Sequence, residues 1–239
     1  MRTSIMATRR PPTERRCPWA KRDVVYRAYH DDEWGRPVVD DQRLFEKLAL
    51  EGFQSGLSWI TILRKREAFR AAFRDFAPAA VARFDTRRVT ALLANPAIVR
   101  HRGKIEATIH NAARVVEIQA SHGSFAAFVW RFAPSTLLRA PHALADVAAT
   151  TDASHALAAE LRAHGFRFVG PTTVYAFMQA MGLVNDHLLG CPARAGCARA
   201  RATILRAFTT ADRPVSSTDA RSHRRLPSHQ ASRHLPARR

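Results

Sequence analysis

Gly165-Phe166-Arg167-Phe168-Val169-Gly170-Pro171-Thr172 is the stretch that decides the fold. Glycine stands at both turning points of this stretch, and the proline stands where the first turn of a helix tolerates one. A helical pattern opens at Asp152 and ends near Gly165, and a second one runs from Pro171 to about Met181. The stretch therefore predicts two helices joined by a short loop.

The loop also has the properties of an anion site. The amides around Val169 and Gly170 lead straight into a helix N-terminus, where N–H groups lack partners and the helix dipole is positive. A phosphate of a DNA backbone is a candidate ligand, and such an element would hold the backbone without reading its sequence. An ordinary helical hairpin explains the loop alone equally well, so both interpretations stand.

The rest of the central section is also helical in pattern. Asp40, Ser58 and Asp85 are predicted N-caps, since each precedes apolar residues that recur with a helical period. A longer helix is expected over about 101–119, and a shorter one near 125–132. No run of alternating residues is long enough for a sheet, so the fold class is predicted to be all-α.

The chain of 239 residues divides into a basic arm, one helical domain and a basic tail. Residues 1–15 are predicted to be a disordered arm, and residues 199–239, rich in Ser, Arg, His and Pro, a disordered tail. Residues 16–198 form the predicted helical domain, with the hairpin near 152–181. Sequence drift is the simpler explanation of both ends, and nonspecific contact with DNA is the alternative.

Most of the formal net charge of +18 lies in these two ends. Residues 1–16 carry a net +4 and residues 192–239 a net +9, which leaves +5 on residues 17–191. A basic domain favours a polyanionic partner such as nucleic acid. Because an arginine-rich composition also arises in GC-rich genomes, the +5 gives modest support and the two ends give less.

Cysteine content and hydropathy indicate the compartment. Three cysteines cannot all pair with one another, and no apolar segment follows the N-terminal arginines as a signal peptide would require. No apolar run approaches the length of a membrane span. We therefore expect a cytoplasmic protein without a disulfide framework and without a membrane partner.

Two pairs of Cys and His residues stand at opposite ends of the central section. Twelve residues separate Cys17 from His30, and three separate His187 from Cys191. Thiolate and imidazole are ligands that zinc favours, and a closed structural site needs four of them. On a helix, His187 and Cys191 would be one turn apart and would point the same way. A lone Cys or His is more often a core or surface residue, so spacing alone leaves the site open.

Several ordered motifs resemble those of one enzyme family. In chain order they are Cys17-Pro18-Trp19, Tyr26-Arg27-Ala28-Tyr29-His30-Asp31-Asp32-Glu33-Trp34-Gly35, Leu50-Glu51-Gly52-Phe53-Gln54-Ser55-Gly56-Leu57-Ser58-Trp59, Arg100-His101-Arg102-Gly103-Lys104-Ile105, Phe166-Arg167-Phe168-Val169-Gly170, Phe177-Met178-Gln179-Ala180 and Gly182-Leu183-Val184-Asn185-Asp186-His187. Over residues 17–191 the chain strongly resembles the 3-methyladenine DNA glycosylase I family of the helix-hairpin-helix DNA glycosylase superfamily. The resemblance implies that superfamily's fold and the hydrolytic release of 3-methyladenine from alkylated double-stranded DNA in base-excision repair.

The resemblance also assigns the metal ligands. The family carries a zinc site built from Cys, His, His and Cys, and the matching residues are Cys17, His30, His187 and Cys191. One structural Zn²⁺ is implied, which joins the N- and C-terminal parts of the domain and keeps no open position for water. Cys197 has no place in the motif and is expected to be a free thiol.

Glu51 is the residue that the resemblance places against the base, as the catalytic-site carboxylate. A carboxylate accepts from the exocyclic amine of adenine, whereas guanine presents a carbonyl oxygen at the equivalent atom. The Tyr29 hydroxyl is expected to complete this polar edge. On the residues alone, Glu51 is a surface glutamate at the end of a helix that Gly52 and Gly56 are expected to interrupt.

Aromatic residues are the predicted stacking surface for the base, because a flipped base regains stacking energy there and an indole face attracts a cationic ring. The candidates are Trp19, Tyr26, Tyr29, Trp34 and Trp59. Tyr29 and Trp59 are favoured because they flank Glu51 in the matched motifs. A hydrophobic core explains Trp34 at least as well.

Other residues are predicted to contact the DNA. Leu57, after Gly56 in a turn, is a candidate wedge that fills the gap of a flipped nucleotide, and a plain helix connector is the alternative. The basic cluster of Arg100, Arg102 and Lys104 is a candidate for phosphate contact, and a solvated face is the alternative. In the hairpin, the predicted contacts are Val169, Gly170 and Thr172.

Two departures from the wider superfamily bear on the reaction. Many members have an attacking lysine early in the helix after the hairpin, but the position near Thr172 offers no amine, so Schiff-base strand cleavage is not expected. Many also have an aspartate after that helix, and the counterpart here is Asn185, or Asp186 if the register differs by one. A cationic base is already a good leaving group, so monofunctional hydrolysis needs no evident acid.

Two other classes of protein remain as alternatives. A noncatalytic DNA-binding protein would use the hairpin and the basic ends, but it would have no use for a pocket around Glu51. A zinc-stabilised interaction module would lack salt-dependent affinity for duplex DNA. For a glycosylase that scans DNA, we expect a monomer.

Overall fold

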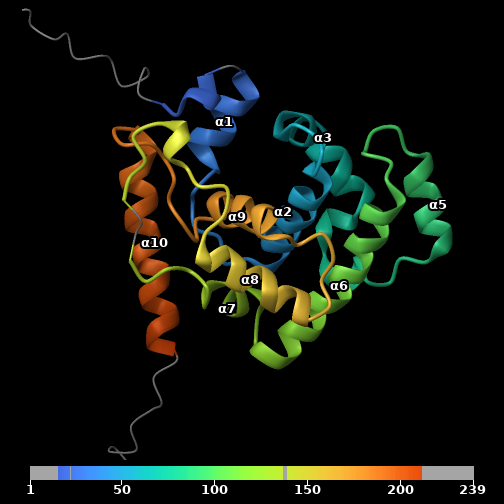
Figure 1. Ribbon diagram of the computed structural model, residues 1–239. Helices are drawn as coiled ribbons and strands as arrows, with labels where there is room; N and C mark the ends of the chain where they lie inside the picture. Colours follow the sequence, from blue (N-terminus) through green and yellow to red (C-terminus); the bar gives the residue numbers. More distant parts are fainter. Residues whose placement is uncertain (1–15, 22, 137–138, 212–239) are drawn as a thin grey trace, which may run out of the picture.

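The computed structural model describes residues 16–21, 23–136 and 139–211 (Figure 1). Within these ranges every regular element is a helix and no strand occurs, which confirms the all-α class. The α-helices are α1 Val24–Asp32, α2 Asp41–Gln54, α3 Trp59–Ala72, α4 Pro78–Val81, α5 Thr86–Ala94, α6 Arg102–His122, α7 Phe125–Trp130, α8 Asp152–Ala163, α9 Pro171–Ala180 and α10 Pro192–Ala211. Short 3-10 helices cover η2 Pro18–Lys21, η3 Arg74–Phe76 and η4 Leu144–Asp146. The predicted arm, residues 1–15, lies outside the described residues.

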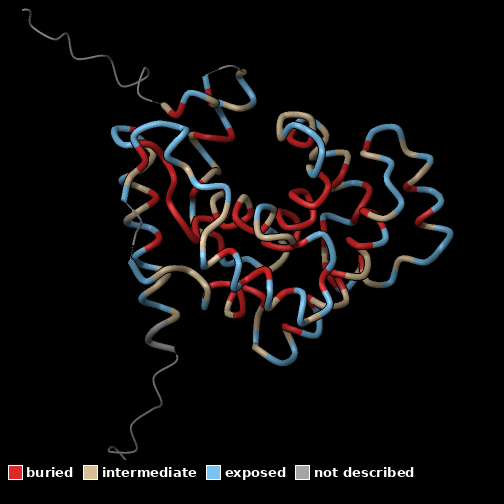
Figure 2. The backbone as a smooth tube through the Cα atoms, viewed as in Figure 1, coloured by how far each residue is buried: buried red, intermediate tan, exposed pale blue. Residues whose placement is uncertain are grey.

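Helices α2 and α9 pack against each other at the centre of the molecule (Figure 1). Every residue of α2 from Leu44 to Phe53 is buried, so this helix has no solvent-facing side over that span. Buried segments accordingly gather in the middle of Figure 2. The polar side chains of α2 must therefore find their partners inside the protein.

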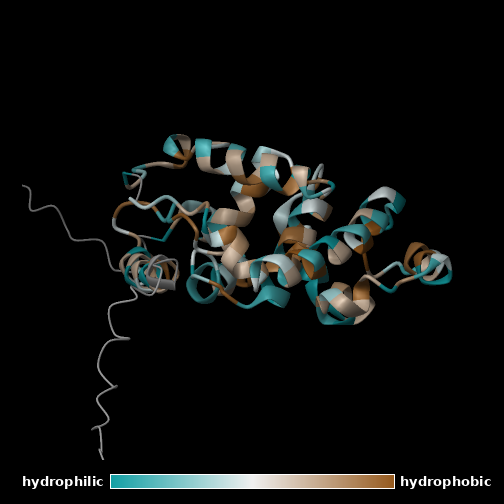
Figure 3. Cartoon of the chain, turned by 90° about the horizontal axis from the view of Figure 1, so that it is seen from below, coloured by the Kyte–Doolittle hydropathy of each residue, from teal (hydrophilic) through white to brown (hydrophobic). Residues whose placement is uncertain are grey.

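The predicted N-caps stand at the starts of three helices. The Asp40 carboxylate accepts from the backbone N–H of Arg43 (2.8 Å), and Asp85 caps α5 in the same way. Ser58 precedes α3, but its hydroxyl lies 2.8 Å from the Thr61 hydroxyl and caps no backbone amide. The outer helices carry both hydrophobic and hydrophilic residues (Figure 3), as expected for helices that bury one face.

The predicted interruption at Gly52 is wrong, because α2 continues through Gly52 and ends at Gln54. Gly56 does lie in the turn that follows, with φ +83°. Gly52 is buried instead, and a β carbon built on it would lie 3.6 Å from the β carbon of Phe168. That distance is an ordinary van der Waals contact, so the loop between α8 and α9 packs on α2 at this residue.

The predicted pair of helices and their short loop are confirmed. Helix α8 ends at Ala163, Gly165 takes a positive φ of +84°, and Pro171 is the first residue of α9. Phe168 in the loop also has a positive φ, +57°. That conformation costs a non-glycine residue roughly 1–3 kcal/mol, so the surrounding packing must hold the loop in this shape.

The predicted start of the tail at residue 199 is wrong, because α10 continues to Ala211. Arg201 is buried on this helix and donates from Nε to the carbonyl of Leu183 (2.8 Å). The ring of Phe208 stacks on Trp130 of α7, with 6.1 Å between centroids. Because Arg201 occupies a buried position of α10, it interrupts the period of apolar residues by which a helix is predicted from sequence. Residues 212–239 of the predicted tail lie outside the described residues.

None of the described helices is long and apolar enough to cross a membrane. This agrees with the hydropathy of the sequence.

Candidate active site and metal centre

A cavity of about 220 Å³ opens between α2, α9, the start of α3 and the segments around α1. Its walls contain Glu51 and all of the aromatic residues predicted to bind a base. The lining residues are Trp19, Tyr26, Tyr29, Trp34, Lys47, Glu51, Gln54, Trp59, Ala176 and Gln179. The structure therefore brings these predicted residues together from separate parts of the chain.

The aromatic side chains form a connected wall. The ring of Trp19 packs edge-on against Tyr26 (5.6 Å between centroids) and Trp34 (5.1 Å), and the Tyr29 ring lies 5.5 Å from that of Trp59. The indole N–H of Trp59 is buried and has no acceptor among the described residues. Aromatic faces with a spare donor suit a planar ligand that carries hydrogen-bond acceptors.

Glu51 is buried in the last turns of α2, and its Oε1 lies 2.7 Å from Nζ of Lys47. The same ammonium donates to the Tyr29 hydroxyl (2.8 Å) and lies 3.2 Å from the centroid of a Trp59 ring. Sequence reasoning missed Lys47. Its only signal was the spacing of four residues to Glu51, which is also common on exposed helices.

Burial and charge shift two of these groups. The pKa of Tyr29 is raised well above its ordinary value, mainly by burial and then by the nearby Glu51 carboxylate. The pKa of Lys47 is lowered by burial, although the attraction of Glu51 opposes that shift. Tyr29 is therefore a protonated phenol at neutral pH, able to donate a hydrogen bond.

Asp186, not Asn185, is hydrogen-bonded to a residue that lines the cavity. Its Oδ2 accepts from the hydroxyl of Tyr175 (2.6 Å) and from Nε2 of Gln179 (2.8 Å), and Gln179 lines the cavity. Asn185 instead donates to the backbone carbonyl of Arg194 (3.0 Å) in α10. Of the two predicted counterparts, Asp186 is thus the one next to the site, where it orients Gln179. Sequence reasoning assigned no role to Tyr175 or Gln179.

The four predicted metal ligands meet in a second, fully buried site. One ligand atom each from Cys17, His30, His187 and Cys191 lies within 4.8 Å of all the others. Nδ1 of His187 is 3.2 Å from Nε2 of His30 and 3.5 Å from Sγ of Cys191. Tetrahedral coordination with the usual zinc–ligand bond lengths places neighbouring ligand atoms roughly 3.3–3.8 Å apart. The cluster therefore has the donors and the spacing to hold a metal ion.

Outer contacts fix the two imidazoles in this arrangement. Nδ1 of His30 lies 2.8 Å from the Asp31 carboxylate, which also accepts from the Arg16 guanidinium (2.9 Å). Nε2 of His187 lies 3.0 Å from the carbonyl oxygen of Trp34. Such partners select the ring nitrogen that faces the metal. Nε2 of His30 and Nδ1 of His187 are therefore the atoms that would face a bound ion.

His187 and Cys191 do not lie on a helix, contrary to the prediction from their spacing. They belong to the turn that precedes α10, where the N–H of Cys191 donates to the carbonyl of Leu188 (2.9 Å). The N–H of Leu188 donates to Sγ of Cys17 (3.4 Å). A hydrogen bond with Cys17 and further ones with His187 and His30 lower the pKa of Cys191, which favours a thiolate there. Cys197 is buried, unpaired in any disulfide and outside the cluster.

The Cys and His cluster and the cavity share a wall. The Trp34 ring packs edge-on against His187 with 4.7 Å between centroids, and the Trp19 ring packs on His30 at 5.1 Å. Both tryptophans line the cavity. Trp34 therefore lies both against the Cys and His cluster and in the cavity wall.

The residues predicted to contact DNA differ in their accessibility. Leu57 is 43% exposed in the turn after α2, and Thr172 and Arg102 are exposed as well. Arg102 pairs with Glu106 on the surface of α6 (3.2 Å). The Val169 side chain is buried, so only its backbone is available for a contact.

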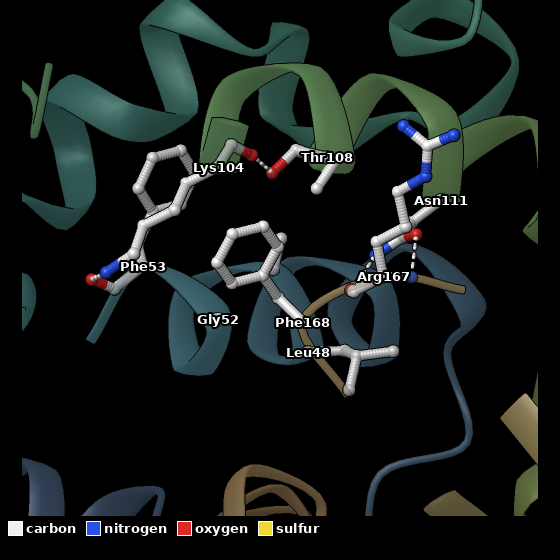
Figure 4. Close-up of a pocket in the computed structure, with 10 residues that line it drawn as sticks. Leu48, Gly52, Phe53, Lys104, Thr108, Asn111, Arg167 and Phe168 are labelled. Atoms are coloured by element: carbon white, nitrogen blue, oxygen red, sulfur yellow. Dashed lines mark hydrogen bonds between the residues drawn. The ribbon is translucent and has the colours of Figure 1, made fainter. Parts of the chain in front are cut away.

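The prediction that Lys104 contacts phosphate is wrong. Its side chain is buried, and Nζ donates to the carbonyls of Phe53 (2.9 Å) and Ser55 (2.5 Å). These carbonyls lie at the C-terminal end of α2, where a cation stabilises the helix dipole. Figure 4 shows Lys104 beside Phe53 in the space between α2 and α6, with the ring of Phe168 pointing into the same space.

The loop between α8 and α9 is held against α6 by a reciprocal pair of hydrogen bonds. Asn111 donates from Nδ2 to the carbonyl of Arg167 (2.9 Å) and accepts from the Arg167 N–H at Oδ1 (2.9 Å), as the dashed lines in Figure 4 show. The loop is therefore fixed relative to α6.

Comparisons with known proteins agree with one another. The family model described as methyladenine glycosylase matches residues 19–195. DNA-3-methyladenine glycosylase 1 of Escherichia coli (strain K12) is 46% identical over 177 residues, which cover 74% of this chain and 95% of that protein. A crystal structure of a 3-methyladenine DNA glycosylase I is 48% identical with a TM-score of 0.72, and the match covers 75% of this chain and 99% of the other.

A third match is the 3-methyladenine DNA glycosylase I of Staphylococcus aureus, solved to give the structural basis of 3-methyladenine recognition. It is 38% identical, has a TM-score of 0.71, and the match covers 75% of this chain and 96% of the other. The fold is thus that of a glycosylase, a hydrolase class of enzyme. Since the family match spans most of its length, the chain belongs to the methyladenine glycosylase family.

Proposed function

We propose that this enzyme releases 3-methyladenine from alkylated double-stranded DNA by hydrolysis of the N-glycosidic bond, in base-excision repair. One observation carries the proposal: the Glu51 carboxylate is buried in a cavity walled by aromatic rings. In DNA, N3-methylated adenine is a planar cation with an exocyclic amine. Aromatic faces attract the cation, and a carboxylate accepts from the amine.

The base reaches this cavity by leaving the duplex. Extrusion costs a few kcal/mol, and stacking on aromatic side chains returns about 1–3 kcal/mol per base. Leu57, which is exposed in the turn after α2, is the proposed wedge that fills the gap in the duplex. The buried N–H of Trp59 adds a donor that a bound base or an ordered water can satisfy.

The loop between α8 and α9 is the proposed grip on the DNA backbone, in the manner of a helix-hairpin-helix element. The backbone amides of Val169 and Gly170 precede the N-terminus of α9, and Thr172 is exposed in its first turn. Unpaired amides at a helix N-terminus bind phosphate. Arg102 on the surface of α6 is a further candidate for phosphate contact.

The chemistry requires little of the protein, because a methylated cationic base is already a good leaving group. The chain's residues need only sequester the base, orient the sugar and stabilise the positive charge that develops on it. Thr172 provides no amine at the start of α9. The proposed enzyme is therefore monofunctional and leaves an abasic site in an intact strand.

Zinc is the proposed ion of the buried Cys and His cluster, and its role is structural. Cys17, His30, His187 and Cys191 would supply all four ligands, which leaves no position for a catalytic water. When bound, the ion supplies folding energy and no step of the reaction. Through Trp19 and Trp34 it would stabilise one wall of the base cavity.

The decisive experiment is incubation of the enzyme with methylated duplex DNA, followed by chromatographic identification of the released bases. We expect 3-methyladenine and no 7-methylguanine. Release of no base from DNA that the protein does bind would instead indicate a noncatalytic DNA-binding protein.

DNA binding itself is tested by the salt dependence of the affinity for duplex DNA. We expect the affinity to fall as salt rises, since phosphate contacts displace counterions. An affinity that salt does not change would contradict the proposed grip on the backbone.

A further inference from the structure

A second charged side chain lies in the base cavity and has no place in the function proposed above. Lys47 precedes Glu51 by one helical turn on α2 and is only 6% exposed. Its ammonium contacts Oε1 of Glu51 at 2.7 Å, the Tyr29 hydroxyl at 2.8 Å and a Trp59 ring at 3.2 Å. An ammonium has three N–H donors, so these contacts match all of them.

These contacts fix the direction of each hydrogen bond. Because an ammonium only donates, the Tyr29 oxygen is the acceptor in its bond with Lys47. The hydroxyl proton of Tyr29 is therefore not used in that bond and is available to an acceptor on a bound base. Glu51 beside an ammonium carries charge and offers only acceptors.

We propose that Lys47 is a positioning residue that sets the hydrogen-bond polarity of the base cavity, with Glu51 held as the acceptor and Tyr29 as the donor. This inference rests on the proposed function, since it requires that the base bind in this cavity. 3-Methyladenine fits that polarity, because it presents an amine to Glu51 and a ring nitrogen to Tyr29. 3-Methylguanine presents a carbonyl oxygen in place of the amine, so two acceptors would face each other.

Removal of Lys47 has a consequence specific to selectivity. Glu51 would then be a buried carboxyl group with no ion-pair partner among the described residues. Burial favours the protonated acid, which carries a donor and can bind a carbonyl oxygen. Tyr29 would also be free to turn its proton toward Glu51. The cavity would therefore discriminate less between an amine and a carbonyl, whatever happens to overall affinity.

The test measures the dissociation constants of free 3-methyladenine and free 3-methylguanine with the full-length, zinc-loaded protein by calorimetry. We expect Lys47→Met, which keeps the length of the side chain but removes its charge and donors, to lower the affinity ratio of the two bases about tenfold or more. That is the size of effect expected when a charge-assisted hydrogen bond is lost. Lys47→Arg, which keeps the charge and donors, is expected to restore most of the ratio.

Lys104→Met is the matched control, because Lys104 is also a buried lysine that contacts α2, through carbonyls at its C-terminal end, but it does not line the base cavity. It is expected to destabilise the fold without changing the ratio. An unchanged ratio in Lys47→Met, or equal weakening of both bases, would overturn the inference. If Lys47→Met does not fold, Lys47→Gln takes its place with the same two outcomes.

Glu51→Gln separates this inference from the proposed function. If Glu51→Gln leaves the binding of 3-methyladenine unchanged, the base does not bind against Glu51, so the base site of the proposed function and the role of Lys47 both fail. If Glu51→Gln weakens binding but Lys47→Met leaves the ratio unchanged, only the role of Lys47 fails.

Discussion

Gly35 leaves the space in which the ring of His187 lies, since a β carbon built on Gly35 would be only 2.9 Å from Nε2 of His187. That nitrogen is 3.0 Å from the carbonyl oxygen of the preceding residue, Trp34. The positive φ of Gly35, +78°, shapes the turn that makes both features possible. The backbone after α1 therefore holds His187 with its other nitrogen toward the metal centre.

Gly35→Ala should damage the metal centre and the fold together. A side chain here meets both the positive φ and the imidazole, so we expect a loss of about 2–4 kcal/mol in the free energy of unfolding and a reduced zinc content. Urea denaturation and metal analysis measure the two effects. Gly123→Ala is the matched control, because Gly123 has φ +79° and nothing within 4 Å of an added β carbon. Equal losses in both variants would contradict the contact with His187.

Glu51→Gln should lower kcat/KM for release of 3-methyladenine by about 10- to 100-fold, because the base loses a charged acceptor. Single-turnover excision from a methylated duplex measures the effect. Glu46→Gln is the control, since Glu46 is also buried on α2 and ion-paired, but to Arg70 (2.9 Å) and away from the base cavity. Comparable losses in the two variants would show that Glu51 only stabilises the helix.

The sequence predicted the all-α class, and which residues meet in the cavity and in the Cys and His cluster, better than it predicted which polar side chains pair with one another inside the protein. Three residues at N-cap positions, two of which accept from a backbone amide, and the glycine–proline loop marked helix ends, because such signals act locally. The place of Glu51 in the cavity and the meeting of Cys17, His30, His187 and Cys191 agree with the ordered motifs. Lys47 was missed because α2 is buried on every side, so the period of its apolar residues does not say which way a lysine points.

Two errors have the same physical origin. Lys104 and Arg201 were counted among exposed basic residues, yet both are buried and donate to backbone carbonyls, of Phe53 in α2 and of Leu183 before α10. A long basic side chain can satisfy free carbonyls inside a protein as readily as phosphates outside it. Composition alone does not distinguish the two uses.

Removal of the metal should destabilise the fold before it affects the chemistry. We expect Cys17→Ala, or treatment with a strong chelator, to lower the free energy of unfolding by at least about 3 kcal/mol, because the buried ligands lose the ion that joins the two ends of the domain. Thermal melting and metal analysis measure this. Cys197→Ala is the control, because Cys197 is buried but outside the cluster, and full zinc content is expected there. A Cys17→Ala protein with unchanged stability would contradict the site.

Acid should weaken the contact between Glu33 and Arg66. Burial alone would raise the pKa of Glu33, but the bidentate hydrogen bonds and charge of Arg66 outweigh it, so the pKa lies below its ordinary value of 4.5. A lowered folded pKa means that the pair stabilises the protein above about pH 4.5 and that this contribution disappears as the pH falls through the folded pKa.

Glu33→Gln should therefore flatten the dependence of stability on pH in this acidic range, by about 1 kcal/mol for a half-buried pair. Denaturation midpoints at several pH values provide the measurement. Glu67→Gln serves as the control, because Glu67 is 79% exposed and its pair with Arg70 is on the surface. A steeper pH dependence in Glu33→Gln than in the parent protein would show that the sign is wrong.

Strand cleavage should be absent even though an amine lines the base cavity. Lyase chemistry needs an unprotonated amine that attacks the sugar carbon. Lys47 is the only amine among the residues that line the cavity, and its nitrogen is held by Glu51 and Tyr29. We therefore expect no covalent complex when borohydride is added during the reaction, and an intact strand that breaks only after alkali. A bifunctional glycosylase in the same assay shows that trapping works. A trapped complex that Lys47→Met abolishes would mean that Lys47 reaches the sugar and that the enzyme is not monofunctional.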